Sequence, residues 1–258
     1  MDRRTYIITG AASGVGAATA RQLQSGGHRV IGVDLHDAEI IADLAAPDGR
    51  DHLAAEATRL TDGVLDGVIA CAGVLQETAL AVRVNFFGAV SSIVATRALL
   101  DRAEAPRAVV VSSVTSIVPR IDDLVSACLE LDEAEAIAIA DRESSDYFPG
   151  NSRIYASTKY ALSRWVKQTA TRSEWAGSGI LLNAVAPCAI ATPMSEKYRS
   201  EEVDKMAVSA GAIGRPYAEP AEIASLLAWL ASPANSLIVG QTVYIDGGFE
   251  AKARPEAI

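Results

Sequence analysis

A glycine-rich turn near the start of the chain constrains the fold more than any other feature. An apolar run, residues 5–9, leads directly into Gly10-Ala11-Ala12-Ser13-Gly14-Val15-Gly16, and a helical pattern follows over residues 17–24. Glycines allow a tight turn and a close approach of the backbone to a pyrophosphate, and the first N–H groups of a helix attract an anion. An ordinary strand-to-helix turn is the alternative, but this position between a strand and a helix favours a dinucleotide-binding loop. The expected loop contacts are Gly10, Ser13, Gly14, Val15 and Gly16.

Short β-branched runs alternate with segments of helical periodicity along the rest of the chain. This alternation is typical of βαβ units on a parallel sheet. No fixed-period repeat, low-complexity tract or linker marks a second domain, and 258 residues fit one large open sheet. We therefore expect a single α/β domain over residues 1–258, a Rossmann-type doubly wound parallel sheet with helices on both faces. Its strands are expected at residues 5–9, 29–34, 67–71, 108–112, 180–185 and 242–245.

The segment over residues 119–150 departs from this alternation. It carries nine acidic and two basic side chains, and so contributes −7 to the chain's net charge of −9. Leu124, Cys128 and Leu131 recur at helical spacing, which predicts a short helical hairpin inserted in the domain. Its acidic side is interpreted as a solvated surface, with a lid over a substrate or an element that blocks oligomerisation as alternatives.

Charge and cysteine content limit the classes of partner. A net charge of −9 argues against nucleic acid and anionic lipid, because both need clustered Lys and Arg. The three cysteines are widely spaced without a CxxC pair and the three histidines lack metal-ligand spacing, so neither disulfides nor a metal are expected. No apolar run reaches the roughly 18 residues of a spanning helix, and the first apolar run is too short for a signal peptide. These features predict a cytoplasmic protein with no membrane span.

Asp34 ends the second expected strand, where a dinucleotide fold places the group that meets the adenosine ribose. A carboxylate accepts hydrogen bonds from the ribose hydroxyls of NAD, whereas it repels the 2′-phosphate of NADP. No Arg or Lys stands at Ser13, Leu35 or His36 to hold that phosphate, although Arg29 begins the same strand. The pattern favours NAD as the cofactor. The alternatives are an Asp34 that only terminates the strand, and a cofactor that is NADP.

Tyr155 and Lys159 lie four residues apart in a helical pattern and therefore project from one face. A nearby ammonium group, together with the positive charge of oxidised nicotinamide, should lower the pKa of the phenol from about 10 towards neutrality. A tyrosine with a lowered pKa is a usable acid/base catalyst. The spacing alone is a weak signal, because Tyr and Lys occur four apart by chance on many helices.

Several motifs follow one another in an order that resembles the short-chain dehydrogenase/reductase family over nearly the whole chain. Residues 9–16 fit TGxxxGxG, and Cys71-Ala72-Gly73 fits the family's NAG motif. The family's asparagine falls at Asn85, and its strand-end serine at Ser113, with Ser112 and Ser116 as possible substitutes. The YxxxK motif is completed by Tyr155 and Lys159.

This resemblance implies hydride transfer between a nicotinamide and the carbon of a small-molecule alcohol or ketone. It implies that Ser113 holds the substrate oxygen and that Tyr155 transfers the proton. Lys159 would bind the nicotinamide ribose and bias Tyr155, and Asn85 would anchor a water that relays protons to Lys159. Tyr155 and Lys159 would also contact the cofactor. The further cofactor contacts implied are Asp34, Leu35, Asp43, Leu44, Ala72, Gly73, Ile190 and Thr192.

Three features depart from the commonest pattern of the family. Cys71 stands where the commonest members have Asn, and Cys188 stands where many have Gly. The acidic insertion separates Ser113 from Tyr155 by 42 positions. The arrangement resembles the bacterial 3α-hydroxysteroid dehydrogenase/carbonyl reductase branch, which implies a steroid, terpenoid or similar alicyclic substrate. It also implies a homodimer formed through the C-terminal helix and strand, with a tetramer as the alternative, because the insertion lies near the helices through which most relatives assemble.

Two other interpretations of function remain open, a catalytically silent NAD-binding redox sensor and an NADP-dependent carbonyl reductase. The segment over residues 188–215 is expected to decide the substrate. Its apolar members Met194, Tyr198 and Met206 either line a substrate pocket or belong to an amphipathic helix packed on the domain. The thiol of Cys188 is interpreted as an inert small apolar group.

Overall fold

A seven-stranded parallel sheet forms the centre of the computed structural model, which describes residues 3–146 and 152–256. The strand order is β3-β2-β1-β4-β5-β6-β7, so the chain reverses its direction of winding between β1 and β4. Ligands of such sheets bind beyond the carboxyl ends of the strands at this reversal. The strands are β1 (Thr5–Thr9), β2 (Arg29–Asp34), β3 (Ile40–Ile41), β4 (Gly67–Ala70), β5 (Arg107–Val111), β6 (Leu181–Pro187) and β7 (Thr242–Ile245).

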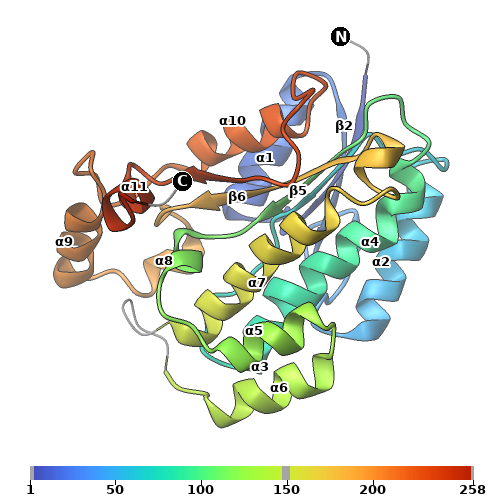
Figure 1. Ribbon diagram of the computed structural model, residues 1–258. Helices are drawn as coiled ribbons and strands as arrows, with labels where there is room; N and C mark the ends of the chain where they lie inside the picture. Colours follow the sequence, from blue (N-terminus) through green and yellow to red (C-terminus); the bar gives the residue numbers. More distant parts are fainter. Residues whose placement is uncertain (1–2, 147–151, 257–258) are drawn as a thin grey trace.

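Helices cover both faces of the sheet (Figure 1). Within β1, Tyr6 and Ile8 are buried in one apolar cluster and Ile7 in the other, as the two-residue period of a strand requires. Burial on both faces explains why the strands read as continuous apolar runs. The helices on one face are α1 (Gly14–Ser25) and α10 (Pro220–Leu230), and those on the other are α2 (Pro47–Leu60), α4 (Ala89–Leu100) and α7 (Arg153–Thr169).

The expected doubly wound parallel sheet is confirmed, with small errors at the ends of its elements. The strand expected to end at Cys71 ends at Ala70, and the one expected at 108–112 is shifted back by one residue. The strand expected at 180–185 runs to Pro187, and the helix expected from residue 17 begins at Gly14. The two-residue strand β3 was not predicted, because so short a run has no periodicity.

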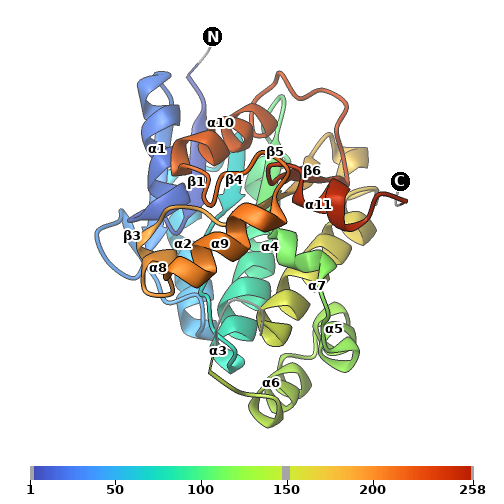
Figure 2. The same cartoon turned by 90° about the vertical axis from the view of Figure 1, so that its left-hand side faces the viewer.

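The predicted helical hairpin is confirmed within the acidic insertion. It consists of α5 (Asp122–Leu129), which packs on α7, and α6 (Glu133–Arg142), which packs on α5 (Figure 2). The placement of Leu131 on the helical face was wrong, because Leu131 lies in the turn with φ 61° and is 55% exposed. Residues 147–150 of the insertion lie outside the described residues.

One continuous helical stretch runs from Ala79 to Leu100 and contains α3 (Ala79–Ala81), the π-helical segment η1 (Val82–Gly88) and α4. By length and composition it is apolar enough to cross a membrane, so the expectation that no segment reaches that length was wrong. Its most apolar window is 61% buried inside the domain. Packing of this helix against the sheet and against α2 and α7 accounts for its apolar side chains.

The remaining elements lie around the carboxyl ends of the strands, on the left in Figure 1. Two of them lie within the segment over residues 188–215 that was expected to decide the substrate. They are the short turn η2 (Val114–Ile117) and the helices α8 (Pro193–Glu196), α9 (Glu201–Ala210) and α11 (Phe249–Ala253). The short turn η3 (Ala176–Ser178) instead precedes β6, at the amino ends of the strands.

Candidate active site

A cavity of about 1210 Å³ opens at the carboxyl ends of the strands. It is lined by every site residue inferred from the sequence except Asn85. Gly10 and Thr192, which are 182 positions apart in the chain, therefore meet at one place. The lining members of that set are Gly10, Ser13, Gly14, Val15, Gly16, Asp34, Leu35, Asp43, Leu44, Ala72, Gly73, Ser113, Tyr155, Lys159, Ile190 and Thr192.

The glycine-rich turn between β1 and α1 brings the backbone close to the end of β4. Gly10 has φ 71°, and a Cβ there would lie 2.9 Å from the backbone nitrogen of Ala72. Ser13 is the N-cap residue of α1, yet its side chain makes no capping hydrogen bond. The first turn of α1 therefore lacks a side-chain cap, and its residues Gly14, Val15 and Gly16 line the cavity, an arrangement suited to an anion.

Asp34 lies beside this turn at the end of β2. Its carboxylate accepts a hydrogen bond from the Ala12 nitrogen at 2.9 Å and another from the Leu35 nitrogen at 2.7 Å. The following wall is formed by Asp43, whose carboxylate accepts from the Ala45 nitrogen at 2.9 Å, and by the buried Leu44. These contacts fix a negative charge and an apolar surface at one end of the cavity.

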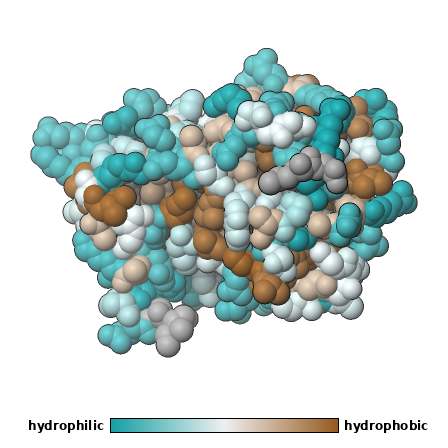
Figure 3. Space-filling model, turned by 90° about the horizontal axis from the view of Figure 1, so that it is seen from above, coloured by the Kyte–Doolittle hydropathy of each residue, from teal (hydrophilic) through white to brown (hydrophobic). Residues whose placement is uncertain are grey.

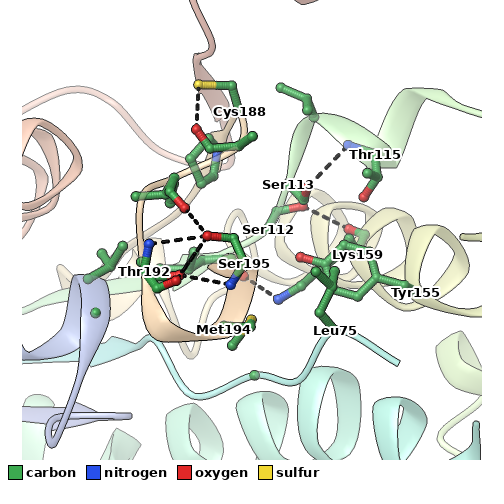
Figure 4. Close-up of a pocket in the computed structure, with 18 of the residues that line it drawn as sticks. Leu75, Ser112, Ser113, Thr115, Tyr155, Lys159, Cys188, Thr192, Met194 and Ser195 are labelled. Atoms are coloured by element: carbon green, nitrogen blue, oxygen red, sulfur yellow. Dashed lines mark hydrogen bonds between the residues drawn. The ribbon is translucent and has the colours of Figure 1, made fainter. Parts of the chain in front are cut away.

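Ser113 and Tyr155 meet at the other end of the cavity, where their side chains are hydrogen-bonded (Figure 4). The Ser113 hydroxyl also accepts a hydrogen bond from the Thr115 nitrogen at 3.2 Å. Ser112 instead donates to the carbonyl of Lys159 at 2.9 Å, and Ser116 does not line the cavity. Of the three serines considered from the sequence, Ser113 is the one that contacts the phenol.

Lys159 lies one helical turn beyond Tyr155 in α7. Its Nζ donates to the carbonyl of Val111 at 2.8 Å and lies 5.7 Å from the centre of the Tyr155 ring. Burial lowers the pKa of Lys159 to about 8. Burial also raises the pKa of Tyr155 to about 12, and the hydrogen bond from Ser113 offsets only part of this. Within the chain alone the pKa of Tyr155 is raised, and the predicted lowering, which also relies on the positive charge of oxidised nicotinamide, stays a prediction.

Asn85 is fully buried in η1 and does not reach the cavity wall. Its side-chain oxygen accepts from the Val74 nitrogen at 2.8 Å, and its side-chain nitrogen donates to the Val74 carbonyl at 2.9 Å. Asn85 and Lys159 both lie beside Gly73. A Cβ placed on Gly73 would be 3.1 Å from the side-chain oxygen of Asn85 and 3.6 Å from the Nζ of Lys159. The structure thus shows Asn85 holding the loop after β4.

Glu77 is a site-supporting residue that sequence reasoning missed. Its carboxylate is 2% exposed and accepts hydrogen bonds from the backbone nitrogens of Ile154 at 2.6 Å and Tyr155 at 2.9 Å. Ser152, the N-cap residue of α7, provides no side-chain cap. Glu77 caps the helix that carries Tyr155 from 78 positions earlier in the chain, and no local pattern signals such a contact.

The side of the cavity across from Ser113 and Tyr155 is apolar. Met194, Tyr198 and Met206 line it, and no residue of α9 is buried in the core. These side chains therefore face the cavity, so the alternative of a helix packed on the domain does not hold for α9. The Tyr198 hydroxyl donates to the Leu75 carbonyl at 3.0 Å and links the two walls.

Cys188 lines the cavity on the side of Thr192 and Met194 in Figure 4. Its thiol donates to the Ala189 carbonyl at 3.4 Å, and burial raises its pKa. A thiol with a raised pKa is a poor nucleophile. The interpretation of Cys188 as an inert group fits this environment.

The helices of the acidic insertion do not line the cavity, and among residues 119–146 only Pro119 touches it. A lid formed by α5 and α6 over this cavity is therefore not what the structure shows. The acidic side chains of the hairpin are mostly at its surface.

Comparison with known proteins gives consistent matches over the whole chain. Residues 10–250 match a family model described as enoyl-(acyl carrier protein) reductase. The 3-alpha-hydroxysteroid dehydrogenase/carbonyl reductase of Comamonas testosteroni is 36% identical over 96% of this chain and 97% of its own length. Aldohexose dehydrogenase of Thermoplasma acidophilum is 22% identical with a TM-score of 0.75 over 96% of this chain and 94% of its own, which shows the shared fold.

A crystal structure of the 3-alpha-hydroxysteroid dehydrogenase of Pseudomonas sp. B-0831 in complex with NADH is also similar to this chain. It is 35% identical, with a TM-score of 0.88 over 98% of this chain and 100% of its own. Sequence identity and structural similarity to these dehydrogenases both extend over nearly the whole chain, and the motif residues lie together at one cavity. The chain therefore belongs to the short-chain dehydrogenase/reductase family of oxidoreductases.

Proposed function

We propose that the protein is an NAD-dependent oxidoreductase that interconverts a secondary alcohol and a ketone, with Tyr155 as the acid/base catalyst. The observation that carries the proposal is the hydrogen-bonded pair Ser113 and Tyr155, which shares one cavity with the glycine turn and Asp34. The similar enzyme from Pseudomonas sp. B-0831 was solved with NADH, which supports the choice of cofactor.

The residues at the Asp34 end of the cavity fit a dinucleotide. The glycine turn gives the close backbone approach, and the N-terminus of α1 suits a pyrophosphate. The fixed Asp34 carboxylate suits ribose hydroxyls and opposes a 2′-phosphate. The chemistry that nicotinamide supplies when bound is acceptance or donation of a hydride at its C4.

The chain's own residues handle the proton of the substrate hydroxyl. Ser113 would orient the substrate oxygen, and Tyr155 would remove the hydroxyl proton during oxidation and return it during reduction. Since burial raises the pKa of Tyr155 to about 12, the phenol needs positive charge nearby to act near neutral pH. Lys159 and an oxidised nicotinamide are the groups that would provide it.

An alicyclic substrate, such as a 3α-hydroxysteroid or a terpenoid alcohol, suits the opposite wall of the cavity. That wall consists mainly of apolar side chains, among them Met194, Val203 and Met206. Rigid alicyclic skeletons bind such surfaces through burial of apolar area. The name of the Comamonas testosteroni relative supports the same substrate class.

The test follows NADH absorbance with the purified protein, NAD or NADP, and a panel of 3α-hydroxysteroids and terpene alcohols. We expect NAD reduction that falls by at least about 100-fold in Tyr155→Phe, the usual size of an acid/base contribution. Tyr160→Phe is the matched control, because Tyr160 lies in the same helix and does not line the cavity. Binding of NADH without turnover of any alcohol or ketone would favour the redox sensor instead.

The cofactor choice has its own test in the Asp34→Ala variant. We expect weaker NAD binding and a smaller discrimination against NADP, because the carboxylate both meets the ribose and repels the phosphate. The two affinities are measured by fluorescence titration. Unchanged NAD affinity in this variant would favour the NADP-dependent reductase.

A further inference from the structure

Arg50 connects the acidic insertion to the end of the cavity that carries Asp34, although Arg50 itself does not line the cavity. It lies in the first turn of α2, six residues after the lining residue Leu44. A positive side chain in the first turn opposes the helix dipole, whereas Asp48 in the same turn favours it.

The guanidinium of Arg50 holds three backbone carbonyl groups from two segments of the cavity wall. Nε donates to the Leu44 carbonyl at 2.8 Å, while Nη2 donates to those of Ala45 at 3.3 Å and Arg83 at 3.2 Å. Leu44 lines the cavity, and Arg83 directly precedes the lining residue Val84. One side chain therefore fixes the separation of these two segments.

Glu133, the first residue of α6, supplies the counter-charge. Its two carboxylate oxygens accept from Nη1 at 2.7 Å and from Nη2 at 2.8 Å of Arg50, a parallel bidentate pair. The Arg50 side chain is only 10% exposed, so water and salt screen the pair weakly. Within residues 3–146 and 152–256, Glu133 is the one carboxylate that forms an ion pair with Arg50.

The insertion holds Glu133 in a fixed place. Asp132 caps α6 by accepting from the Glu135 nitrogen at 3.0 Å, and Ala136 and Ala140 are fully buried. The helix α6 packs on α5, α3 and η1, and both views show it beneath α3 (Figures 1 and 2). A rigid element therefore presents the carboxylate to Arg50.

We propose that the insertion is a brace for the adenine side of the dinucleotide site, acting through the pair Glu133 and Arg50. Glu133 and Arg50 are positioning residues, because neither lines the cavity. The inference rests on the proposed binding of NAD. It gives the insertion a role other than a lid, since the cofactor affinity depends on a residue of the insertion.

The test is a titration of the full chain with NADH and, separately, with AMP, which contains only the adenosine half. We expect Glu133→Gln to weaken both by the same factor, roughly 3- to 30-fold, the size of coupling through positioning residues. Glu135→Gln is the control, because it removes the same charge from the same helix, and among the described residues Glu135 forms one ion pair, an exposed one with Arg142 at 3.7 Å. The control should bind both ligands as the unaltered chain does.

The direction of the change in NADH affinity distinguishes the brace from a general effect of the net charge of the chain. Removing a carboxylate from a chain of net charge −9 should by itself favour an anionic ligand, so weaker binding has a local cause. In a double-mutant cycle, the variant that combines Arg50→Lys with Glu133→Gln should lose little more NADH affinity than either single variant. Equal NADH affinity of Glu133→Gln and Glu135→Gln overturns the brace, whereas no NADH binding by the unaltered chain overturns the proposed function and the brace together.

Discussion

Lys159 is buried in surroundings that disfavour its positive charge. It is 4% exposed, and no carboxylate is among the causes that shift its pKa. Because the pKa of about 8 lies below the ordinary 10.5, the unfolded chain holds this proton more tightly than the folded chain does. Burial of the charged Lys159 therefore destabilises the folded chain by its full amount below pH 8, and this effect disappears as the pH rises through 10.5.

Replacing Lys159 by Met should therefore stabilise the fold at neutral pH while it abolishes activity. The shift of pKa corresponds to roughly 3 kcal/mol at most, since one pKa unit equals about 1.4 kcal/mol. Urea denaturation of both proteins measures the difference, which should shrink steadily between pH 8 and 10.5. A Lys159→Met variant that is less stable than the unaltered chain at neutral pH contradicts this account.

Glu77→Gln should lower kcat without changing NADH affinity. The amide can accept only one of the two hydrogen bonds that the carboxylate accepts, so the first turn of α7 loosens around Tyr155. We expect a loss of about 1 kcal/mol in stability, the usual size of a capping contribution, and a fall of kcat by about 10-fold.

The control for Glu77 is Asp66→Ala, which removes the acceptor of a hydrogen bond from the Thr5 nitrogen at 2.8 Å and does not alter the cavity lining. This variant should lose similar stability and keep its kcat. If both variants lose stability and neither loses kcat, Glu77 has only a structural role.

Sequence reasoning at the residue scale found the side chains that carry a local motif. Tyr155 and Lys159 share a helix, and Asp34 ends a strand, so these local patterns and the order of the motifs identified them. Glu77 and Arg50 act through contacts with segments 78 and 83 positions away, respectively, and such contacts leave no periodic pattern in the chain. Burial of Tyr155, which raises the pKa of its phenol, is not visible in a sequence.

At the scale of elements, the strands were predictable because burial on both faces makes them continuous apolar runs. The alternation of strands and helices was sufficient to give the parallel sheet. The turn after Cys128 was not predictable, because helical spacing of apolar residues continues through Leu131 although the backbone does not. The π-helical η1 was also missed, since it shares its composition with the helices on either side.

The turn between β1 and α1 can be tested by Gly10→Ala. Gly10 has φ 71°, and the added methyl group would lie 2.9 Å from the Ala72 nitrogen, so we expect loss of NADH binding. Gly27→Ala is the matched control, because Gly27 has φ 84° but no atom within 4 Å of the added Cβ. Both should lose about 1 kcal/mol of stability from backbone strain. Equal NADH affinity of the two variants, measured by titration, would contradict the role of the turn.

At the scale of the whole molecule, the insertion changes which surfaces remain open for assembly. The helix α5 packs on α7, one of the long helices beside the sheet, and so covers part of that side. The opposite side, where α10 lies, is seen from above in Figure 3 and shows apolar patches among polar ones. Trp229 of α10 is 44% exposed, and β7 is the edge strand next to β6.

We therefore expect a homodimer that assembles through α10 and β7, with twice the chain mass of 27.0 kDa in light scattering. Trp229→Glu should convert it to the monomer, because a charge buried in an apolar contact is strongly unfavourable. Val94→Glu is the matched control, since Val94 is a 52% exposed apolar residue of α4 on the side of the long helices. Dissociation by Val94→Glu instead of Trp229→Glu would place the interface on the side of α4 and α7, and a mass of four chains would show that the insertion does not prevent the tetramer.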